Sequence, residues 1–258
     1  MKTAGVVTWL AVAAALVPSA ARAQTMLDQE QRLIDIHALL LELPPVSAPA
    51  DLPPMGARVG LEVIGVPPID GTTAARRQIT ASDQLPAFPR PRADVALPLG
   101  AEGLRLHAGL AYVPPLTVND VSAHIGAGEL GLGWVAGAWH AELRGQVVVA
   151  QTLSPVTERD TRDRLTVFET GGDLSAGRDF DLGFGRLMPY VGGGVVYTNG
   201  LFRVTSDGVE LRSREIVPVF DAGARLLAFE HWEATAELEA VPRRFVHPSF
   251  RIAYVFGF

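Results

Sequence analysis

The sequence of 258 residues contains no cysteine. Neither a disulfide framework nor a lipid-modified N-terminal cysteine is therefore possible. Beyond the first 23 residues, no stretch is apolar for long enough to form a transmembrane helix. If the chain spans a membrane, it must do so as a closed barrel, because only helices and barrels satisfy every backbone polar group in lipid.

Lysine is almost absent as well. Lys2 is the only lysine, so all other permanent cations are arginines. The chain has 22 basic and 28 acidic residues, and removing residues 1–23 would delete Lys2 and Arg22, which changes the net charge from −6 to 20 − 28 = −8. An acidic balance argues against a nucleic-acid partner. The remaining length suits one domain.

Residues 1–23 have the organisation of a secretory signal peptide. Lys2 supplies the positive charge, residues 6–17 form an apolar core, and Ala21-Arg22-Ala23 is a small-residue cleavage site before Gln24. The apolar core is too short for a membrane span. We therefore expect export and cleavage after residue 23.

Residues 24–56 are predicted to form a periplasmic region that contains one helix. From position 25 to 43, Leu33, Ile36, Leu40 and Leu43 recur at helical spacing, and Pro44-Pro45 ends the pattern. Residues 44–56, rich in proline and alanine, are predicted to be a linker. Packing on the barrel base or lying on the inner leaflet is the favoured role of the helix, since it is too polar to span. A lumen plug and an oligomerisation helix stay open, as does the oligomeric state.

From residue 57 onward the apolar period changes to two, which indicates strands. The candidate strands cover 57–66, 88–99, 103–113, 124–135, 138–150, 164–177, 186–199, 215–228, 232–242 and 249–258. Each has roughly the 9–11 residues that a tilted strand needs to cross a bilayer. Short connections alternate with longer polar ones, as in outer-membrane barrels. The sequence thus predicts an all-β, antiparallel, up-and-down transmembrane barrel of about ten strands over 57–258. Eight strands are the alternative, if the first hairpin lies outside the wall.

The last strand has one continuous apolar face, which consists of Phe250, Ile252, Tyr254, Phe256 and Phe258. An unshielded aromatic edge at a chain terminus would promote aggregation in water but suits lipid. An alternating strand that ends in Phe resembles the C-terminal strand of Gram-negative outer-membrane β-barrels. The resemblance implies recognition by the barrel-assembly machinery and residence in the outer membrane, among lipid and lipopolysaccharide. No subfamily motif is present, so no functional residues are carried over.

Aromatic residues are predicted to form two bands on the lipid-facing side. Bilayer interfaces select for aromatic side chains at both ends of membrane-spanning strands. The periplasmic band consists of Trp134, Trp139, Trp232 and Phe258, and the outer band of Phe88, Tyr112, Phe202 and Phe250. The outward face of strand 186–199 is left open, because both of its faces carry apolar residues.

The opposite faces of the strands are predicted to place a charge network in the lumen. Its members are Arg58, Glu62, Arg92, Asp94, Arg105, Glu129, Glu142, Arg144, Glu169, Asp173, Asp221, Arg225, Glu233, Glu237, Glu239 and Arg251. Opposite charges would satisfy one another in a narrow lumen, where a lone buried charge is costly. If Trp134 and Trp139 lie opposite each other in neighbouring strands, Glu129 lies opposite Arg144. Opposing Ala228 with Trp232 would put Asp221 opposite Glu239, which Arg251 could also approach.

Three functions follow from such a barrel. The favoured one is a structural or surface-interaction barrel whose lumen is filled with side chains. The first alternative is a narrow diffusion channel, which would prefer cations because acidic residues are in excess. In the loop 67–87, Arg76 and Arg77 could contact lipopolysaccharide phosphates.

The second alternative is a hydrolase at the barrel rim. Its candidate pairs are Asp120 with His124 and His247 with Ser249, but neither has a third orienting group, and no G-x-S-x-G motif occurs. The six histidines lack metal-ligand spacing, so no metal site and no cofactor are predicted. The favoured interpretation is that the protein is not an enzyme.

Overall fold

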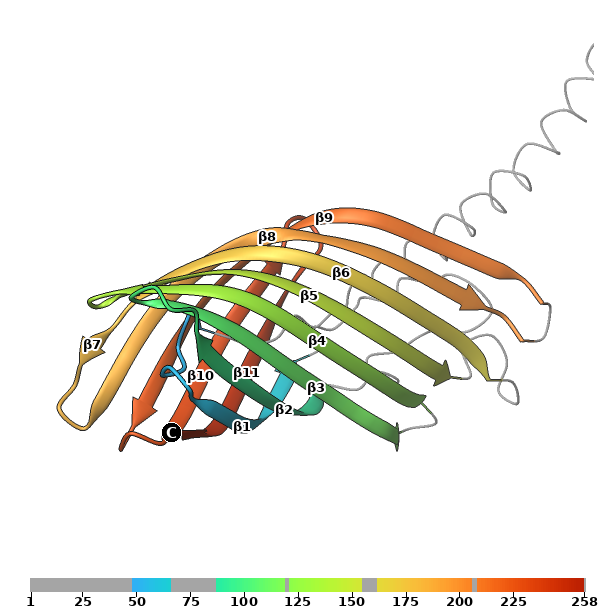
Figure 1. Ribbon diagram of the computed structural model, residues 1–258. Coiled ribbons are helices and arrows are strands. Elements are labelled where there is room, and N and C mark those ends of the chain that lie inside the picture. The colour runs from blue at the N-terminus through green and yellow to red at the C-terminus, as the bar shows by residue number, and fades with distance from the viewer. Residues whose placement is uncertain (1–47, 66–86, 119–120, 155–161, 206–207, 258) are drawn as a thin grey trace, which may run out of the picture.

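The computed structural model describes residues 48–65, 87–118, 121–154, 162–205 and 208–257, which form one antiparallel sheet (Figure 1). The strands are β1 (Ala57–Gly65), β2 (Ala87–Pro98), β3 (Leu104–Val118), β4 (Val121–Ala136), β5 (Trp139–Ser154), β6 (Asp163–Arg178), β7 (Phe180–Asp181), β8 (Gly185–Arg203), β9 (Glu210–Ala228), β10 (Trp232–Val241) and β11 (Phe245–Phe256). The predicted signal peptide, the predicted helix 25–43, Arg76, Arg77 and Phe258 lie outside the described residues.

Within the described residues, the sheet closes into a barrel of ten long strands. Neighbours in sequence pair from β1 to β6, β6 pairs with β8, and β8 to β11 continue to β1, where Arg58 lies opposite Val255. β7 has two residues and only extends the turn that leads into β8. The predicted ten-stranded barrel is confirmed. The eight-stranded alternative is wrong, because β1 and β2 are part of the closed wall.

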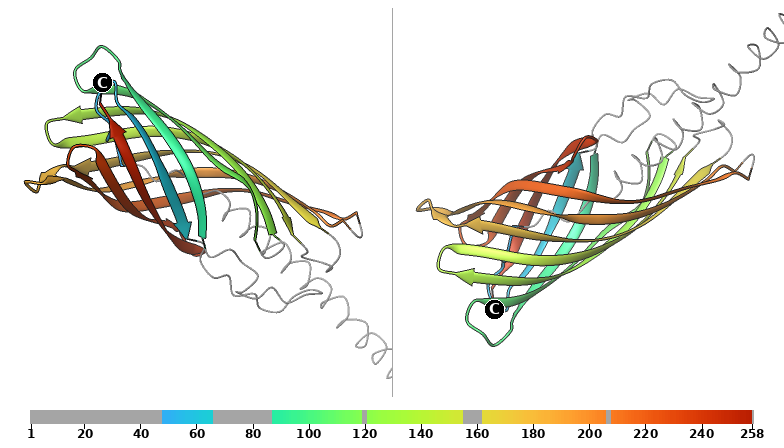
Figure 2. Two further views of the ribbon diagram at one scale, coloured as in Figure 1. Left: turned by 90° about the horizontal axis from the view of Figure 1, so that it is seen from below. Right: turned by 90° about the horizontal axis from the view of Figure 1, so that it is seen from above.

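The two ends of the barrel differ. The turns after β2, β4 and β9, the start of β1 and the end of β11 lie at one end, which we call the base; the opposite end is the mouth (Figure 2). The strands continue further toward the mouth than the sequence predicted. β3 and β4 pair up to Val118 and Val121, so most of the polar segment 114–123 belongs to the wall. The base carries the short turns that face the periplasm in outer-membrane barrels.

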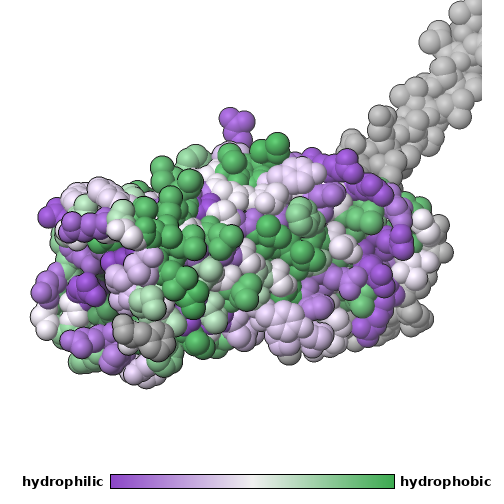
Figure 3. Space-filling view, viewed as in Figure 1, coloured by the Kyte–Doolittle hydropathy of each residue, from purple (hydrophilic) through white to green (hydrophobic). Residues whose placement is uncertain are grey.

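The outer face of the barrel is apolar. Leu110 in β3 is 73% exposed, and Leu143 in β5 and Ile216 in β9 are also exposed. Figure 3 shows apolar residues over the middle of the face in view and hydrophilic residues toward both ends. Such a band fits a hydrocarbon layer rather than water. No helix among the described residues is long and apolar enough to cross a membrane.

Tryptophans lie outward near the base, as predicted. Trp134, Trp139 and Trp232 are all exposed there. One member of the predicted outer band is placed differently. Phe202 points into the barrel and is 9% exposed, because the even-numbered residues of β8 face inward. This parity also settles which face of β8 is outward.

The inner face has two zones. Charged and polar side chains line the half near the base and continue to mid-barrel. The half near the mouth is lined by buried apolar side chains, which we call the apolar wall. Its members are Ile64, Ala111, Val113, Ala123, Ile125, Ala127, Val148, Ala150, Leu165, Val167, Phe202 and Val204. The predicted lumen network had contained only charged residues.

The segment that precedes β1 lies inside the barrel. Leu52 packs against Ala96, Leu227 and Val255 near the base, and Ala48 packs against Met188 and its neighbour Tyr190. Both Leu52 and Ala48 are buried. The last residues of the predicted linker are therefore part of the lumen packing.

Candidate functional site: the charged lumen

Three arginines from three strands converge on one glutamate at the centre of the charged zone. Glu233 of β10 lies 3.0 Å from Arg58 of β1, 2.9 Å from Arg225 of β9 and 2.7 Å from Arg251 of β11. Strand alternation places all four side chains inside the barrel. One carboxylate cannot neutralise three guanidiniums, so a second anion is required.

Asp51, from the segment before β1, supplies that anion. Its Oδ2 contacts Arg58 and lies 3.6 Å from Arg225 and 3.5 Å from Arg251. We call Asp51, Glu233 and the three arginines the central cluster. All five side chains are at most 2% exposed. Buried ions of this kind persist only when each is paired.

The central cluster continues along β1 and β2. Arg58 donates to Asp94 at 2.9 Å, and Arg92 donates to the other oxygen of Asp94 at 2.7 Å. Glu62 lies 2.7 Å from Arg90 and 3.1 Å from Arg92. Acids and bases thus alternate across neighbouring strands, which neutralises the charge on this side of the lumen.

A third group of charges joins β4, β5 and β6. Arg144 binds Asp173 through two hydrogen bonds of 3.0 and 3.1 Å, a geometry that suits the guanidinium fork. Glu129 lies 3.9 Å from Arg144 and also pairs with Arg92. Glu129 therefore links this group to the charges on β2.

Backbone atoms of the segment before β1 are held by side chains of the wall. The Ala50 amide donates to Glu142 at 2.6 Å. The Ala50 carbonyl lies 3.2 Å from His140 Nδ1, and Arg105 donates to the Leu52 carbonyl. The segment is therefore fixed by its main chain as well as by Asp51.

A small acidic cavity lies beside Arg144, toward the mouth. Asp221, Glu237 and Glu239 line it, and its volume of about 10 Å³ suits a single water-sized occupant. Glu237 accepts a hydrogen bond from Tyr190 at 2.6 Å, and Glu239 lies 2.9 Å from His247. Glu237 thus has a neutral partner and Glu239 a histidine partner.

The structure places every residue of the predicted lumen network inside the barrel. Arg105 and Asp221 are half-buried, and the others are buried. Several lumen residues had not been singled out for the network: Asp51, Arg90, His107, His140, Gln146, Tyr190, Thr235, His247 and Ser249. Arg90 has the same strand parity as Arg92 and Asp94, and that signal was available in the sequence.

The predicted register is correct on one side of the barrel and wrong on the other. Asp221 does lie opposite Glu239. Glu129 lies opposite Gln146 instead of Arg144, since the turn after β4 is shorter than expected. Arg251 pairs with Glu233 and not with Glu239, whose neighbour on β11 is His247.

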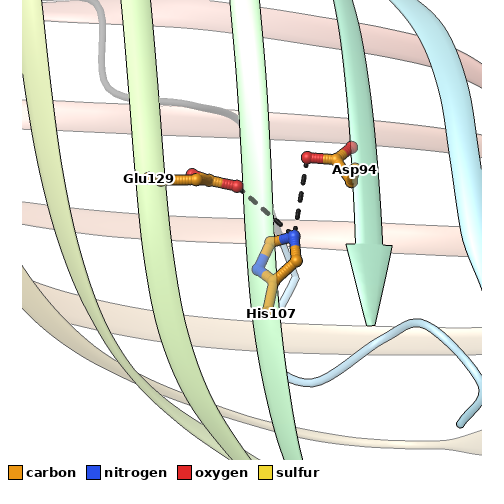
Figure 4. Close-up of side chains that lie close together, drawn as sticks. All are labelled: Asp94, His107 and Glu129. Atoms are coloured by element: carbon orange, nitrogen blue, oxygen red, sulfur yellow. Dashed lines mark ion pairs between the residues drawn. The ribbon is translucent and has the colours of Figure 1, made fainter. Parts of the chain in front are cut away.

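Asp94, His107 and Glu129 form the one group among the described residues with the spacing of a metal site (Figure 4). His107 Nε2 lies 3.5 Å from Asp94 and 3.4 Å from Glu129, and its Nδ1 lies 2.9 Å from Glu142. Both carboxylates of the group already bind Arg92. A metal ion would have to displace or face this guanidinium, so the group fits an ion-pair network better than a metal centre.

The candidate hydrolase residues do not assemble into a catalytic arrangement. His124 is exposed on the outer face and packs edge-on against Tyr112, with ring centroids 5.3 Å apart. Its predicted partner Asp120 lies outside the described residues. His247 and Ser249 are both buried in the lumen, and within the described residues no hydrogen bond joins them. The nucleophile-and-base geometry of a hydrolase is therefore not formed by these residues.

Asp179 lies at the base, in the turn after β6. Burial raises the pKa of Asp179, but the hydrogen bond from His140 and the positive charges of His140 and Arg186 lower it more strongly. The net effect is a pKa below the usual range for aspartate. Asp179 thus remains ionised and ties this turn to β5.

No protein-family model and no curated protein matches the chain. Solved structures with a similar arrangement include the translocator domain of the autotransporter NalP from Neisseria meningitidis, with 12% identity, a TM-score of 0.46, and coverage of 93% of this chain and 98% of that one. The β domain of the Bordetella autotransporter BrkA has 15% identity and a TM-score of 0.42, with 79% and 98% covered. The N-terminal β-barrel domain of Pseudomonas aeruginosa OprF has 14% identity and a TM-score of 0.29, with 77% and 97% covered.

These likenesses are too distant to indicate a function. The closed strand order and the apolar outer face carry the assignment instead. The chain is a β-barrel of the outer-membrane type. The barrel's last strand presents Phe250, Ile252 and Phe256 outward and Arg251 inward, as the alternation predicted.

Proposed function

We propose that this protein is a closed outer-membrane barrel with a structural or surface-interaction role, and that its lumen does not conduct solutes. The observation that carries the proposal is the central cluster. It joins β1, β9, β10 and β11 to Asp51 across the base half of the lumen. A diffusion channel would instead present rings of like charge to water.

Packing supports the same conclusion. The segment before β1 fills space between opposite walls, since Leu52 contacts Ala96 and Leu227 while Ala50 is held by Glu142. The cavity beside Arg144 is large enough for about one water molecule. Neither feature provides a continuous aqueous path through the base half.

A narrow cation-preferring channel is the second candidate. The acidic cavity favours it, because Asp173, Asp221, Glu237 and Glu239 bring four carboxyl groups to one site, and Arg144 is the one arginine among the described residues that line it. Recordings from purified protein in a planar bilayer decide between the candidates. A closed barrel gives no conductance steps under conditions in which an open porin conducts. Steps with cation preference would overturn the closed barrel and support the channel.

The environment of the barrel is proposed from the same features. A leader over residues 1–23 would send the chain to the periplasm, where β11 would be recognised by the barrel-assembly machinery, and the finished barrel would sit in lipid and lipopolysaccharide. Arg76 and Arg77 are the proposed lipopolysaccharide contacts. Heat-modifiable migration of protein extracted from outer membranes is the expected result, whereas a soluble periplasmic protein would refute this placement.

A further inference from the structure

The apolar wall requires a partner that the charged lumen does not provide. Its residues come from β1, β3, β4, β5, β6, β8 and the position just after β8, and they form one continuous cluster at the mouth half. Val148 of β5 is 0% exposed and faces the lumen, whereas the adjacent Val147 is 43% exposed and faces outward. An apolar surface inside a water-filled mouth would be unfavourable, since burying such surface is a main source of stability.

The described segment before β1 does not cover this wall. Leu52 packs in the base half, and Ala48 packs against Met188 and Tyr190. The segment does, however, run into the lumen. Followed from β1 toward the N-terminus, it passes Leu52 near the base and reaches the buried Ala48 deeper in the barrel. The described segment therefore begins at Ala48, within the lumen.

We propose that the amphipathic helix predicted over residues 25–43 docks in the mouth half of the lumen, with its apolar stripe against the apolar wall. The stripe of Leu33, Ile36, Leu40 and Leu43 is what such a wall would bind. Leu43 is separated from Ala48 by so few residues that the two are at most roughly 17 Å apart along the chain. The predicted helix is thus covalently tethered close to the apolar wall.

The dimensions are compatible. A helix over 25–43 is about 28 Å long and about 10 Å wide. β5 has 16 residues, which at about 3.3 Å each and a tilt of about 40° give roughly 40 Å along the barrel axis, so each half is about 20 Å deep. The helix would fill the mouth half and extend beyond it. Ten strands also enclose a wider interior than the eight-stranded barrels that side chains alone can fill.

This inference goes beyond the proposal that the base half is closed. A helix could occupy the mouth half whether or not the barrel conducts solutes. Cross-linking tests it independently of conductance. The chain has no cysteine, so introduced pairs are unambiguous. In the folded, heat-modifiable protein, Leu40→Cys combined with Val148→Cys is expected to form a disulfide or a short bis-maleimide link. The matched control, Leu40→Cys with Val147→Cys, differs by one residue of β5 and should form none.

A small panel of cysteine pairs allows for different registers of the helix against the apolar wall. Leu33→Cys, Ile36→Cys and Leu40→Cys are each paired with Val148→Cys and Val167→Cys. If no pair links while the barrel remains folded, the proposal is overturned. Linking of Val148→Cys to a cysteine placed in the connection 66–86 instead would identify that connection as the occupant and also overturn it.

A second measurement does not depend on cross-linking geometry. The single variant Val148→Cys should react slowly with a maleimide, and replacing Leu33, Ile36 and Leu40 by serine in the same full chain should accelerate the reaction at least about tenfold. Equal rates would overturn the proposal. Binding of the apolar probe N-phenylnaphthylamine to the unmodified chain, abolished by Val148→Trp, would make the wall a ligand site and likewise overturn it.

Discussion

Asp51 Oδ2 lies 3.5 Å from Arg251 Nη2, so the segment before the first strand and the last strand meet inside the lumen. The backbone already joins β1 to β11 through eight residue pairs from Ala57–Phe256 to Ile64–Ser249. The Asp51–Arg251 contact adds a side-chain tie between the two ends of the barrel sequence. Closure and charge pairing therefore depend on each other in this protein.

Glu233→Gln should destabilise the folded barrel strongly. The change leaves Asp51 as the one anion among three buried guanidiniums of the central cluster. Loss of one partner from a buried pair costs about 3–5 kcal/mol. Denaturant titration of the folded fraction, followed by heat-modifiable migration, measures the loss.

The control for this change is Glu210→Gln. Glu210 pairs with Arg203 near the mouth, where the two side chains are 35% and 54% exposed. Exposed pairs contribute less than about 1 kcal/mol. Equal losses in Glu210→Gln and Glu233→Gln would show that the central cluster is not a special source of stability.

Gly223→Ala should disturb the acidic cavity. Gly223 lies beneath Tyr190, and an added Cβ would come within 2.5 Å of the Tyr190 hydroxyl, which donates to Glu237. Overpacking of this kind costs about 1–3 kcal/mol. The matched control is Gly145→Ala in β5, where the nearest atom to the added Cβ is the Gly171 carbonyl oxygen at 3.9 Å.

The same denaturant titration separates the two glycine variants. Gly223→Ala should be the less stable, and Gly145→Ala should stay close to the unmodified protein. If both are equally stable, Tyr190 has room to move and the hydrogen bond to Glu237 does not hold it in place.

Leu110→Arg should destabilise the barrel in lipid if the outer face of β3 contacts the bilayer. Leu110 is exposed near the middle of β3, where an arginine would face the bilayer midplane at a cost of about 2–4 kcal/mol. Leu99→Arg, just after β2 at the base, should cost no more than about 1 kcal/mol. Folding stability is measured in lipid vesicles. In a barrel surrounded by water, both substitutions would be close to neutral.

The sequence predicted the wall of this barrel well because strand alternation is a local property. Glu233 and Arg251 were assigned to inward faces, and both are buried inside the barrel, although the sequence had placed Arg251 near Glu239. The β4–β5 register depended on a turn, which the sequence interpretation made too long. Gly137 adopts φ +59°, and a two-residue turn pairs Ala136 with Trp139. The two-residue difference moved Glu129 opposite Gln146.

The contents of the lumen were less predictable. Asp51 lies in a proline-rich segment without periodicity, and its contacts to Arg225 and Arg251 span most of the sequence. No local pattern reports such a contact. The apolar wall did leave a signal, since Val148 continues the parity of Gln146 in β5. The change from polar to apolar along an inward face marks where one zone of the lumen ends.

Asp51→Asn should release the segment before β1 without unfolding the barrel. The substitution keeps the size of the side chain but removes the charge that faces Arg58, Arg225 and Arg251. Hydrogen exchange measured by mass spectrometry should become about 10–100-fold faster in residues 48–52, which corresponds to about 1.4–2.8 kcal/mol of local stability. Strand amides should be unaffected.

Asp181→Asn is the matched control for that experiment. Asp181 lies in β7 at the base, accepts a hydrogen bond from the Gly183 amide and is exposed. Its substitution should leave exchange in residues 48–52 unchanged. Ala50 is the most informative position in Asp51→Asn, because its amide donates to the buried Glu142 and is protected for as long as the segment stays in the lumen. Unchanged protection at Ala50 in Asp51→Asn would mean that backbone contacts with the wall, and not the charge of Asp51, hold the segment in place.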